Sequence, residues 1–376
     1  MSIKGTKTIF LFPGQGAQYR GMALDLLEAG GTEVKRLFET ASEICGKDMQ
    51  ALLRDSDDET LKRTDISQPA ITLANLAAAA FLAEQGIHPA ACAGFSLGEY
   101  AALVCASVIK VEDCFTLVKA RGEAMQKSAD RIRREADSAV PSPEECLPGM
   151  AKLPGMAAVI GLAPEKVESL ITEWKTSAGN GGAIAGLYPA NINSPKQLVV
   201  SGTAAALAEA EKLFKEAGAR RFIRLQVAGP FHSPLIADAA EIFRPVLEAA
   251  SFYDPAIPFY SNVTGTRVTS GAELKKFALA QITSPVRWTE EEAAINAEWN
   301  GASETAEKIV VLEPQPSEPA SEGSSVLEPQ PSSLASEGSS VLETGPGKVL
   351  QGLWKDSGSV IPCYAAGTAE TIMELL

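Results

Sequence analysis

The chain has 376 residues, of which 45% are hydrophobic and 21% charged, and this balance excludes global disorder and supplies apolar material for a sizeable core. Its formal net charge of -14 argues against nucleic acid as a partner, because an acidic surface repels phosphate backbones. Six scattered cysteines without a CxxC pair argue against zinc sites and disulfides and favour a reducing, cytoplasmic compartment.

The first part of the chain alternates apolar strands and apolar helices, which predicts an α/β layer with parallel strands. Ser67 is a candidate cap for the helix that begins before residue 71, with Pro69 in its first turn. The apolar stretch 87–109 is interrupted by polar residues, so we expect no membrane span. The expected elements, in order, are a strand at 8–12, a helix at 24–45, a helix at 71–85, a strand at 90–93, and helices at 100–106 and 111–126.

The middle of the chain follows a different order, β-α-β-β-α-β, between residues 156 and 227. This order is typical of a ferredoxin-like unit. We expect a ferredoxin-like subdomain at 150–227, inserted into a large α/β-hydrolase-like domain made of residues 1–149 and 228–376.

Two segments look like insertions. Residues 127–155 are charged and contain proline, which fits either a linker or an extension of the preceding helix. Residues 313–340 hold a 15-residue repeat rich in Pro, Ser and Glu, which predicts a disordered excursion. The sequence VLE occurs at 311, 326 and 341, and the pattern leaves open which copy occupies the one strand position available.

A GxSxG sequence, Gly94-Phe95-Ser96-Leu97-Gly98, lies between a short predicted strand and a helix. In that context the pattern is typical of a nucleophile elbow, in which the serine occupies a strained turn and the helix N-terminus faces the site. A Gly-rich turn with serine as a helix cap gives the same pattern. Ser96 is therefore a candidate nucleophile that needs a neighbouring base.

Only two histidines are available as that base. His88 precedes the strand that leads to Ser96, and we expect it to be a polar loop residue. His232, in AGPFHSPL, lies where the chain re-enters the large domain, and such a junction commonly forms a cleft wall. We therefore favour His232 as the base.

Two further segments belong to the expected site. The loop PGQGAQ at 13–18 follows the first strand and should face the elbow, so one of its N–H groups is a candidate oxyanion donor. Arg121 lies among apolar neighbours on the helix after the elbow helix, where it suits capture of a carboxylate, although the spacing fits a surface arginine equally well.

The motifs FPGQGAQ, GFSLGEYAAL, RGEAMQ, ANINSPKQLVVSG, GPFHSPL, SNVTG, TSPVRW and TGPGKVL occur in one order along the chain. In this order they resemble the malonyl-CoA:acyl carrier protein transacylases and related acyltransferase domains. The resemblance covers the chain except the two insertions. It implies an α/β-hydrolase-like core with an inserted ferredoxin-like subdomain, which agrees with the order of the predicted elements.

The resemblance also implies roles for individual residues. Ser96 would carry the malonyl group, His232 would act as its base, and Arg121 would pair with the malonyl carboxylate. The other implied roles belong to Gln15 and Leu97, whose backbone N–H groups would form the oxyanion hole, to Arg287, whose backbone carbonyl would orient the histidine, and to Asn191 and Asn193, which would support the pocket.

Specificity residues and partners follow from the same resemblance. Phe231 resembles the residue of malonyl-selective members, where bulk is thought to exclude an α-methyl branch, whereas Phe95 departs from the histidine that family members often have. The implied partners are malonyl-CoA and acyl carrier protein, with no metal and no organic cofactor. Because carrier proteins are acidic, docking calls for a local basic patch; the candidates are Arg220, Arg221, Arg224, Lys196, Lys275 and Lys276.

Two other functions fit the same residues. A serine esterase or thioesterase uses the same elbow, although its histidine usually lies close to the C-terminus, and here 144 residues follow His232. A non-catalytic module that binds carrier proteins is the other, and an intact Ser96 and His232 argue against it.

Overall fold

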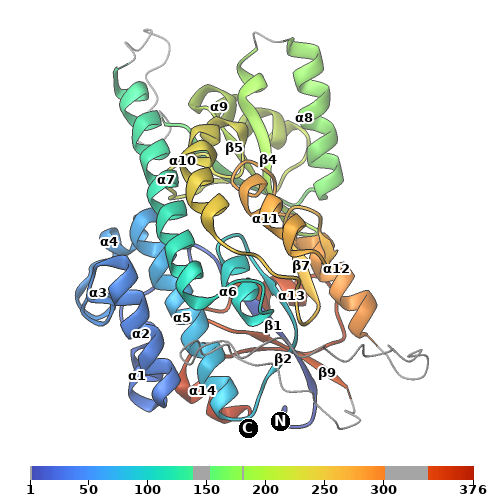
Figure 1. Cartoon of the computed structure of the whole chain (residues 1–376). Helices are drawn as coiled ribbons and strands as arrows, with labels where there is room; N and C mark the ends of the chain where they lie inside the picture. Colours follow the sequence, from blue (N-terminus) through green and yellow to red (C-terminus); the bar gives the residue numbers. More distant parts are fainter. Residues whose placement is uncertain (1, 139–152, 180–181, 301–337) are drawn as a thin grey trace.

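A computed structural model describes residues 2–138, 153–179, 182–300 and 338–376 of the protein. Two β-sheets, each covered by helices, build the molecule, and the smaller one lies at the upper end of the view in Figure 1. The predicted fold class, an α/β core with a separate antiparallel sheet, is confirmed.

The large sheet has six strands in the order β10-β9-β1-β2-β7-β8. Its neighbouring strands are parallel except for the pair β7 and β8. Along β1, Phe10 and Phe12 enter one hydrophobic cluster and Ile9 and Leu11 enter another, as expected of a strand buried on both faces. The strands are β1 (Lys7–Phe12), β2 (Pro89–Gly94), β7 (Phe259–Ser261), β8 (Thr266–Val268), β9 (Ser339–Glu343) and β10 (Cys363–Ala365).

The third copy of VLE forms the strand whose origin the sequence left open. Val341, Leu342 and Glu343 belong to β9, which pairs with β1 on one side and β10 on the other. The other two copies, most of the predicted repeat excursion and residues 139–152 of the first insertion lie outside the described residues. At the start of that first insertion the preceding helix continues to Ser138, so its first residues extend the helix.

Helices surround the large sheet (Figure 1), and α5 and α6 are buried along almost their whole length. Among the described residues, α5 alone is long and apolar enough to cross a membrane, but 89% of its apolar window is buried inside the protein. Its composition is thus explained by its place in the core. These helices are α1 (Leu24–Ala29), α2 (Thr32–Cys45), α3 (Met49–Asp55), α4 (Asp58–Lys62), α5 (Thr64–Glu84), α6 (Gly98–Cys105), α7 (Val111–Ser138), α10 (Ala237–Ala249), α11 (Gly271–Ala280), α12 (Trp288–Trp299), α13 (Val349–Asp356) and α14 (Ala369–Glu374).

Two predicted helix boundaries are wrong. The helix expected over 24–45 is broken between α1 and α2 at Gly30 and Gly31, which lack helical backbone angles.

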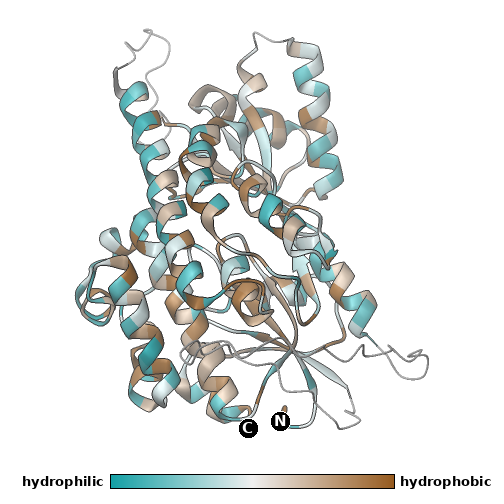
Figure 2. Ribbon diagram, viewed as in Figure 1, coloured by the Kyte–Doolittle hydropathy of each residue, from teal (hydrophilic) through white to brown (hydrophobic). Residues whose placement is uncertain are grey.

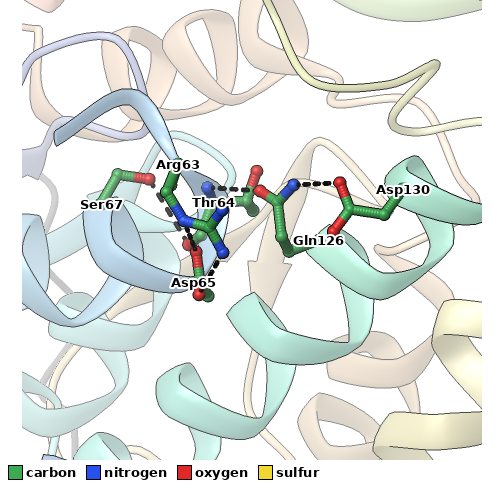
Figure 3. A network of polar contacts seen from close by, with 6 residues as sticks. All are labelled: Arg63, Thr64, Asp65, Ser67, Gln126 and Asp130. Atoms are coloured by element: carbon green, nitrogen blue, oxygen red, sulfur yellow. Dashed lines mark hydrogen bonds and ion pairs between the residues drawn. The ribbon is translucent and has the colours of Figure 1, made fainter. Parts of the chain in front are cut away.

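Ser67 does not cap α5, which begins three residues earlier at Thr64. The Thr64 N–H donates to Gln126 on α7 at 2.9 Å, and Figure 3 shows this contact together with the Arg63–Asp65 ion pair. A tertiary partner therefore satisfies the helix start that the sequence assigned to a local cap.

The small sheet is antiparallel, with the order β4-β5-β3-β6, and α8 and α9 bury their apolar residues against it. Figure 2 shows hydrophilic residues along α8, as expected of a helix with only one buried face. The strand order agrees with the predicted ferredoxin-like unit. The elements are β3 (Gly155–Ile160), α8 (Pro164–Ala178), the 3-10 turn η2 (Ala183–Gly186), β4 (Leu187–Ser194), β5 (Gln197–Gly202), α9 (Ala204–Glu216) and β6 (Arg221–Arg224); the 3-10 turn η3 (Pro234–Ile236) follows in the large part.

The two parts of the molecule are joined through β4. The Ile192 N–H donates to the Val286 carbonyl at 2.8 Å, and the Val286 N–H donates to the Ala190 carbonyl at 2.9 Å. This pairing continues the small sheet into the segment that precedes α12. It holds β4 against the large part at the place where the candidate site lies.

Candidate active site

Ser96 lies in the turn between β2 and α6, with a positive backbone φ of 51°. This left-handed conformation is uncommon for a residue with a side chain and is typical of a nucleophile elbow. Gly94 and Gly98 permit the turn, because a Cβ on Gly94 would overlap the backbone of Gly98 and one on Gly98 would overlap the Phe12 carbonyl. The turn is thus pressed against the end of β1.

His232 faces Ser96 across the cavity, and the distance from its Nε2 to the Ser96 Oγ is 2.8 Å. His232 also has a positive φ, 55°, and only 4% of it is exposed. His88, in contrast, precedes β2 at the end of the strand opposite to Ser96, where its carbonyl accepts a hydrogen bond from Thr8. Of the two histidines in the chain, His232 is therefore the one placed beside the serine.

The backbone groups that contact the histidine belong to Gln281 and Ser284, and the prediction of Arg287 is wrong. His232 Nδ1 lies 2.9 Å from the Gln281 carbonyl oxygen, which fixes the protonated nitrogen on the side away from Ser96. Arg287 instead precedes α12; its N–H donates to the Asn262 carbonyl and its guanidinium pairs with Glu290. Gln281 lies six residues earlier, at the end of α11, where the chain turns toward the site.

Burial, together with the nearby Arg121 cation, lowers the pKa of His232 to about 4. The imidazole is therefore neutral at physiological pH. With its proton on Nδ1, its Nε2 has a free lone pair that faces the Ser96 hydroxyl. This arrangement can accept the serine proton as the oxygen attacks a carbonyl carbon.

Arg121 is buried on α7, with 1% of its surface exposed, so the alternative of a surface arginine is excluded. Its Nη2 lies 3.0 Å from the Gln281 Oε1 and 3.5 Å from the Ser96 Oγ. Its Nε is buried without a hydrogen-bond partner among the described residues. A guanidinium with a free donor beside the nucleophile suits an acyl group that carries a carboxylate.

These groups line one cavity of about 340 Å³ between the two parts of the molecule. The PGQG loop and the elbow supply one wall, and β4 and the segment before His232 supply the other. The predicted residues that line it are Gln15, Phe95, Ser96, Leu97, Arg121, Asn191, Asn193, Phe231 and His232.

Two backbone N–H groups are available beside Ser96. Among the described residues, neither the Gln15 N–H nor the Leu97 N–H donates a hydrogen bond within the protein. Leu97 directly precedes α6, so its N–H belongs to the positive end of that helix. Both groups are thus free to bind an oxygen that becomes negative near Ser96.

Two asparagines of β4 also line the cavity. Asn191 pairs through its backbone with Val286, at the joint between the two parts. Asn193 is 8% exposed, and its Oδ1 has no hydrogen-bond partner among the described residues. An amide so placed offers an acceptor to a ligand in the cavity.

Two phenylalanines add apolar surface. Phe231, next to His232, is 5% exposed, and its carbonyl accepts a hydrogen bond from Ser201. Phe95 packs its ring edge-on against Trp288, with 5.4 Å between the ring centroids. Phe95, which stands where family members often have a histidine, is therefore held in place by an aromatic contact.

A buried polar network behind Ser96 was missed by the sequence analysis. Asn262 accepts the Ser96 N–H at 2.6 Å and donates to the Gly94 carbonyl at 2.7 Å and to Glu291 at 2.8 Å. Its own N–H donates to Glu99 at 3.0 Å. Asn262 lies in SNVTG, one of the motifs of the resemblance, and Glu99 in another, so those motifs were the available signal. The network holds the backbone of the strained turn in place.

The fold and the site define an α/β protein in which a serine in a nucleophile elbow meets a histidine, the arrangement of serine hydrolases and acyltransferases. The family model described as "Acyl transferase domain" matches residues 9–178. The malonyl CoA-acyl carrier protein transacylase of Bacillus subtilis is 38% identical over 285 residues, which cover 76% of this chain and 81% of that protein. The chain thus belongs to the malonyl CoA-acyl carrier protein transacylase family.

Solved structures show the same likeness over the full length. An acyl carrier protein S-malonyltransferase from Vibrio cholerae superposes with a TM-score of 0.75 at 32% identity, covering 99% of this chain and 100% of that one. A malonyl-transacylase solved in complex with a type II PKS acyl-carrier protein has a TM-score of 0.75 at 29% identity, covering 99% of each chain.

Proposed function

We propose that the protein transfers a malonyl group from malonyl-CoA to the phosphopantetheine thiol of acyl carrier protein, supplying fatty-acid synthesis. The observation that carries the proposal is that Ser96, His232 and Arg121 converge in one cavity. A nucleophile, a base and a buried cation are what the transfer of a carboxylated acyl group requires. Membership of the transacylase family supports the same reaction.

In the first half-reaction Ser96 attacks the thioester carbon of malonyl-CoA. His232 takes the serine proton on Nε2, while the Gln281 carbonyl stabilises the imidazolium through Nδ1–H. The Gln15 and Leu97 N–H groups bind the oxyanion, and each such donor is typically worth ~2.7–4 kcal/mol in the transition state. His232 then returns the proton to the coenzyme A sulfur, which leaves as the thiol.

In the second half-reaction the carrier protein's thiol attacks the malonyl-serine ester. His232 removes the thiol proton and returns it to Ser96, so one ester intermediate serves both steps and ping-pong kinetics follow. No metal or organic cofactor is needed, because the thioester already supplies an activated acyl group. We place the reaction in the cytoplasm, where the cysteines stay reduced.

Two side chains set the choice of acyl group in this proposal. Arg121 binds the free carboxylate of malonyl with its unpartnered Nε–H and with Nη2. Phe231 narrows the cavity beside His232 and disfavours a methyl branch on the α-carbon. One methyl group changes selectivity by only ~1–3 kcal/mol, so methylmalonyl-CoA is a slow substrate.

Mass spectrometry of the intact protein after mixing with malonyl-CoA tests the proposal. We expect the mass to increase by one malonyl group on Ser96, and addition of acyl carrier protein should remove it. Ser96→Ala is the control and should gain nothing. A wild-type protein that gains no adduct contradicts the proposal and fits a non-catalytic binding module, whereas rapid loss of the adduct to water without any thiol indicates an esterase or thioesterase.

A further inference from the structure

Arg121 is a buried cation without a direct counter-ion. None of the ion pairs among the described residues includes it. Its guanidinium carbon lies 5.6 Å from the centre of the Tyr100 ring, which offsets part of its charge. A charge removed from water needs compensation by other charges or dipoles. While no acyl group is bound, this compensation must come from groups that do not contact Arg121 directly.

Gln281 connects Arg121 to that compensation. The Gln281 Oε1 accepts from Arg121 at 3.0 Å, and its Nε2 donates to the Glu99 Oε2 in a buried contact. The same Nε2 also lies 3.1 Å from the Ser96 carbonyl oxygen. One amide thus lies between the guanidinium and a carboxyl group, with its acceptor toward the cation and its donor toward the acid.

The surroundings of Glu99 are those of an ionised carboxylate. It is 4% exposed and accepts hydrogen bonds from the Asn262 N–H, the Gln281 amide and the Ser261 side chain. Glu291, its neighbour in the network, differs: it accepts one hydrogen bond, from Asn262, and its Oε2 has no partner among the described residues. Donors stabilise an anion, so of the two carboxyl groups Glu99 is the one that ionises more readily, and Glu291 keeps its proton to higher pH.

We propose that Glu99 is a specificity-determining positioning residue, which neutralises Arg121 through Gln281 in the empty site and so limits the preference for carboxylated acyl groups. The inference rests on the proposed function. When a malonyl group binds, its carboxylate meets Arg121 from the cavity while Glu99 already acts on the cation from behind. The two anions repel each other in a buried, weakly screened site, and part of the attraction to Arg121 is lost.

Glu99→Gln tests this inference, because it removes the charge and keeps the shape. Its amide can still accept from Asn262 and donate to Ser261, and the Gln281 Nε2 retains the Ser96 carbonyl and the Asn262 Oδ1 as acceptors. The measured quantity is the ratio of kcat/KM for malonyl-CoA to that for acetyl-CoA, whose acyl group is uncharged. We expect the ratio to rise at least about fivefold, mainly through KM for malonyl-CoA.

Glu291→Gln is the matched control. Glu291 is a buried carboxyl group bound to the same Asn262. Because it carries a proton, replacing it by an amide removes no charge. We expect its ratio to stay within about twofold of the wild-type value, even if both rates fall. A Glu99→Gln ratio that stays constant or falls overturns the inference, because a purely structural role slows both acyl groups alike.

The wild-type protein offers a second test that does not depend on how a variant folds. Burial raises the pKa of Glu99 to about 7. Below this pH Glu99 is protonated and the repulsion is lost, so KM for malonyl-CoA should fall relative to KM for acetyl-CoA as pH drops from 8.5 to 6. The charged or titratable groups that face Glu99 are Tyr100 on α6, Arg121 on α7 and Glu291 on α12.

Of these groups, Arg121 stays a cation, and Tyr100 stays neutral over this range because burial raises its pKa. Burial also raises the pKa of Glu291 well above its ordinary value, which favours its protonated form. A KM ratio independent of pH overturns the inference. Failure of the inference is distinguishable from failure of the proposed function. If only the inference fails, the wild-type protein still forms malonyl-serine, but the ratios of kcat/KM and of KM between malonyl-CoA and acetyl-CoA do not change as expected. If the proposed function fails, the wild-type protein forms no malonyl-serine.

Discussion

Two residues with positive backbone φ angles, Ser96 and His232, meet in the cavity with 2.8 Å between their reactive atoms. Backbone strain of this kind costs about 1–3 kcal/mol per residue and persists where the surroundings impose it. Asn262 imposes it on Ser96, and the Gln281 carbonyl holds the ring of His232. The strained pair is therefore positioned by residues far away in the chain.

Arg121→Ala should abolish selectivity for malonyl groups. The variant removes the buried cation, so malonyl-CoA loses its partner, and we expect kcat/KM for malonyl-CoA to fall at least about a hundredfold, or ~3 kcal/mol. Transfer of acetyl from acetyl-CoA should be retained or increased. Undiminished malonyl transfer in this variant, measured with purified carrier protein, would show that Arg121 does not bind the carboxylate.

His232 makes the stability of the protein depend on pH. Its pKa is about 4 when folded and 6.5 when unfolded, so between these values only the unfolded chain takes up the proton. Stability is therefore lost as pH falls below 6.5. From pH 7 to 5 the free energy of unfolding should drop by about 2 kcal/mol more in wild type than in His232→Asn, as measured by urea unfolding. Equal drops in the two proteins would contradict the lowered pKa.

At the scale of elements, the site depends on how closely α6 approaches β1. Gly98, the first residue of α6, lies against the Phe12 carbonyl, and a Cβ there would also lie 2.9 Å from the Pro13 carbonyl oxygen. The elbow between β2 and α6 therefore tolerates no side chain at this position.

Gly98→Ala should destabilise the protein by about 3 kcal/mol and reduce acyl transfer, because the added methyl group separates the elbow from β1. Gly352→Ala is the matched control: Gly352 is inside α13, and a Cβ there meets nothing within 4 Å. That change should stabilise the protein by ~0.5–1 kcal/mol through helix propensity. Thermal unfolding of both variants measures the difference, and a Gly98→Ala protein as stable as wild type would contradict the close approach.

At the scale of the whole molecule, the cavity lies between two parts, and the proposed function requires it to admit the phosphopantetheine arm of a carrier protein, which we expect to be acidic. Lys196 and Arg221 are exposed on the small sheet, and Lys196 adjoins Gln197, which lines the cavity. Two other candidates have contacts within the protein: Lys275 donates to the carbonyls at the end of α10, and Arg224 donates to the Leu153 carbonyl. Arg220 and Lys276 are exposed as well. We propose Lys196 and Arg221 for carrier docking, because Lys196 adjoins the cavity and its carbonyl accepts from Gly161, next to Ile160, which pairs with Arg221.

Lys196→Glu combined with Arg221→Glu should raise KM for acyl carrier protein about tenfold at low salt, and added salt should shrink the effect. The second half-reaction is measured on pre-formed malonyl-enzyme, with free pantetheine as an uncharged acceptor whose rate should not change. Lys110→Glu, an exposed lysine that does not line the cavity, is the control. Equal KM values for carrier protein in the double variant and wild type would exclude this patch.

The sequence by itself determined which residues lie at the centre of the site. Ser96 is marked by a contiguous pattern between a strand and a helix, and His232 is one of only two histidines. The order of elements between 156 and 227 likewise predicted the small sheet, because hydrophobic periodicity is a local property.

The tertiary structure alone decided which residues support that centre. The Gln281 amide reaches the Ser96 carbonyl across 185 positions of the chain, and Asn262 reaches the Ser96 N–H across 166. No local pattern shows that such residues meet, because hydrogen bonding between them depends on how helices and strands pack. The same reason explains why Arg287 was predicted in place of Gln281 and why only the fold could assign the strand β9 to the third copy of VLE.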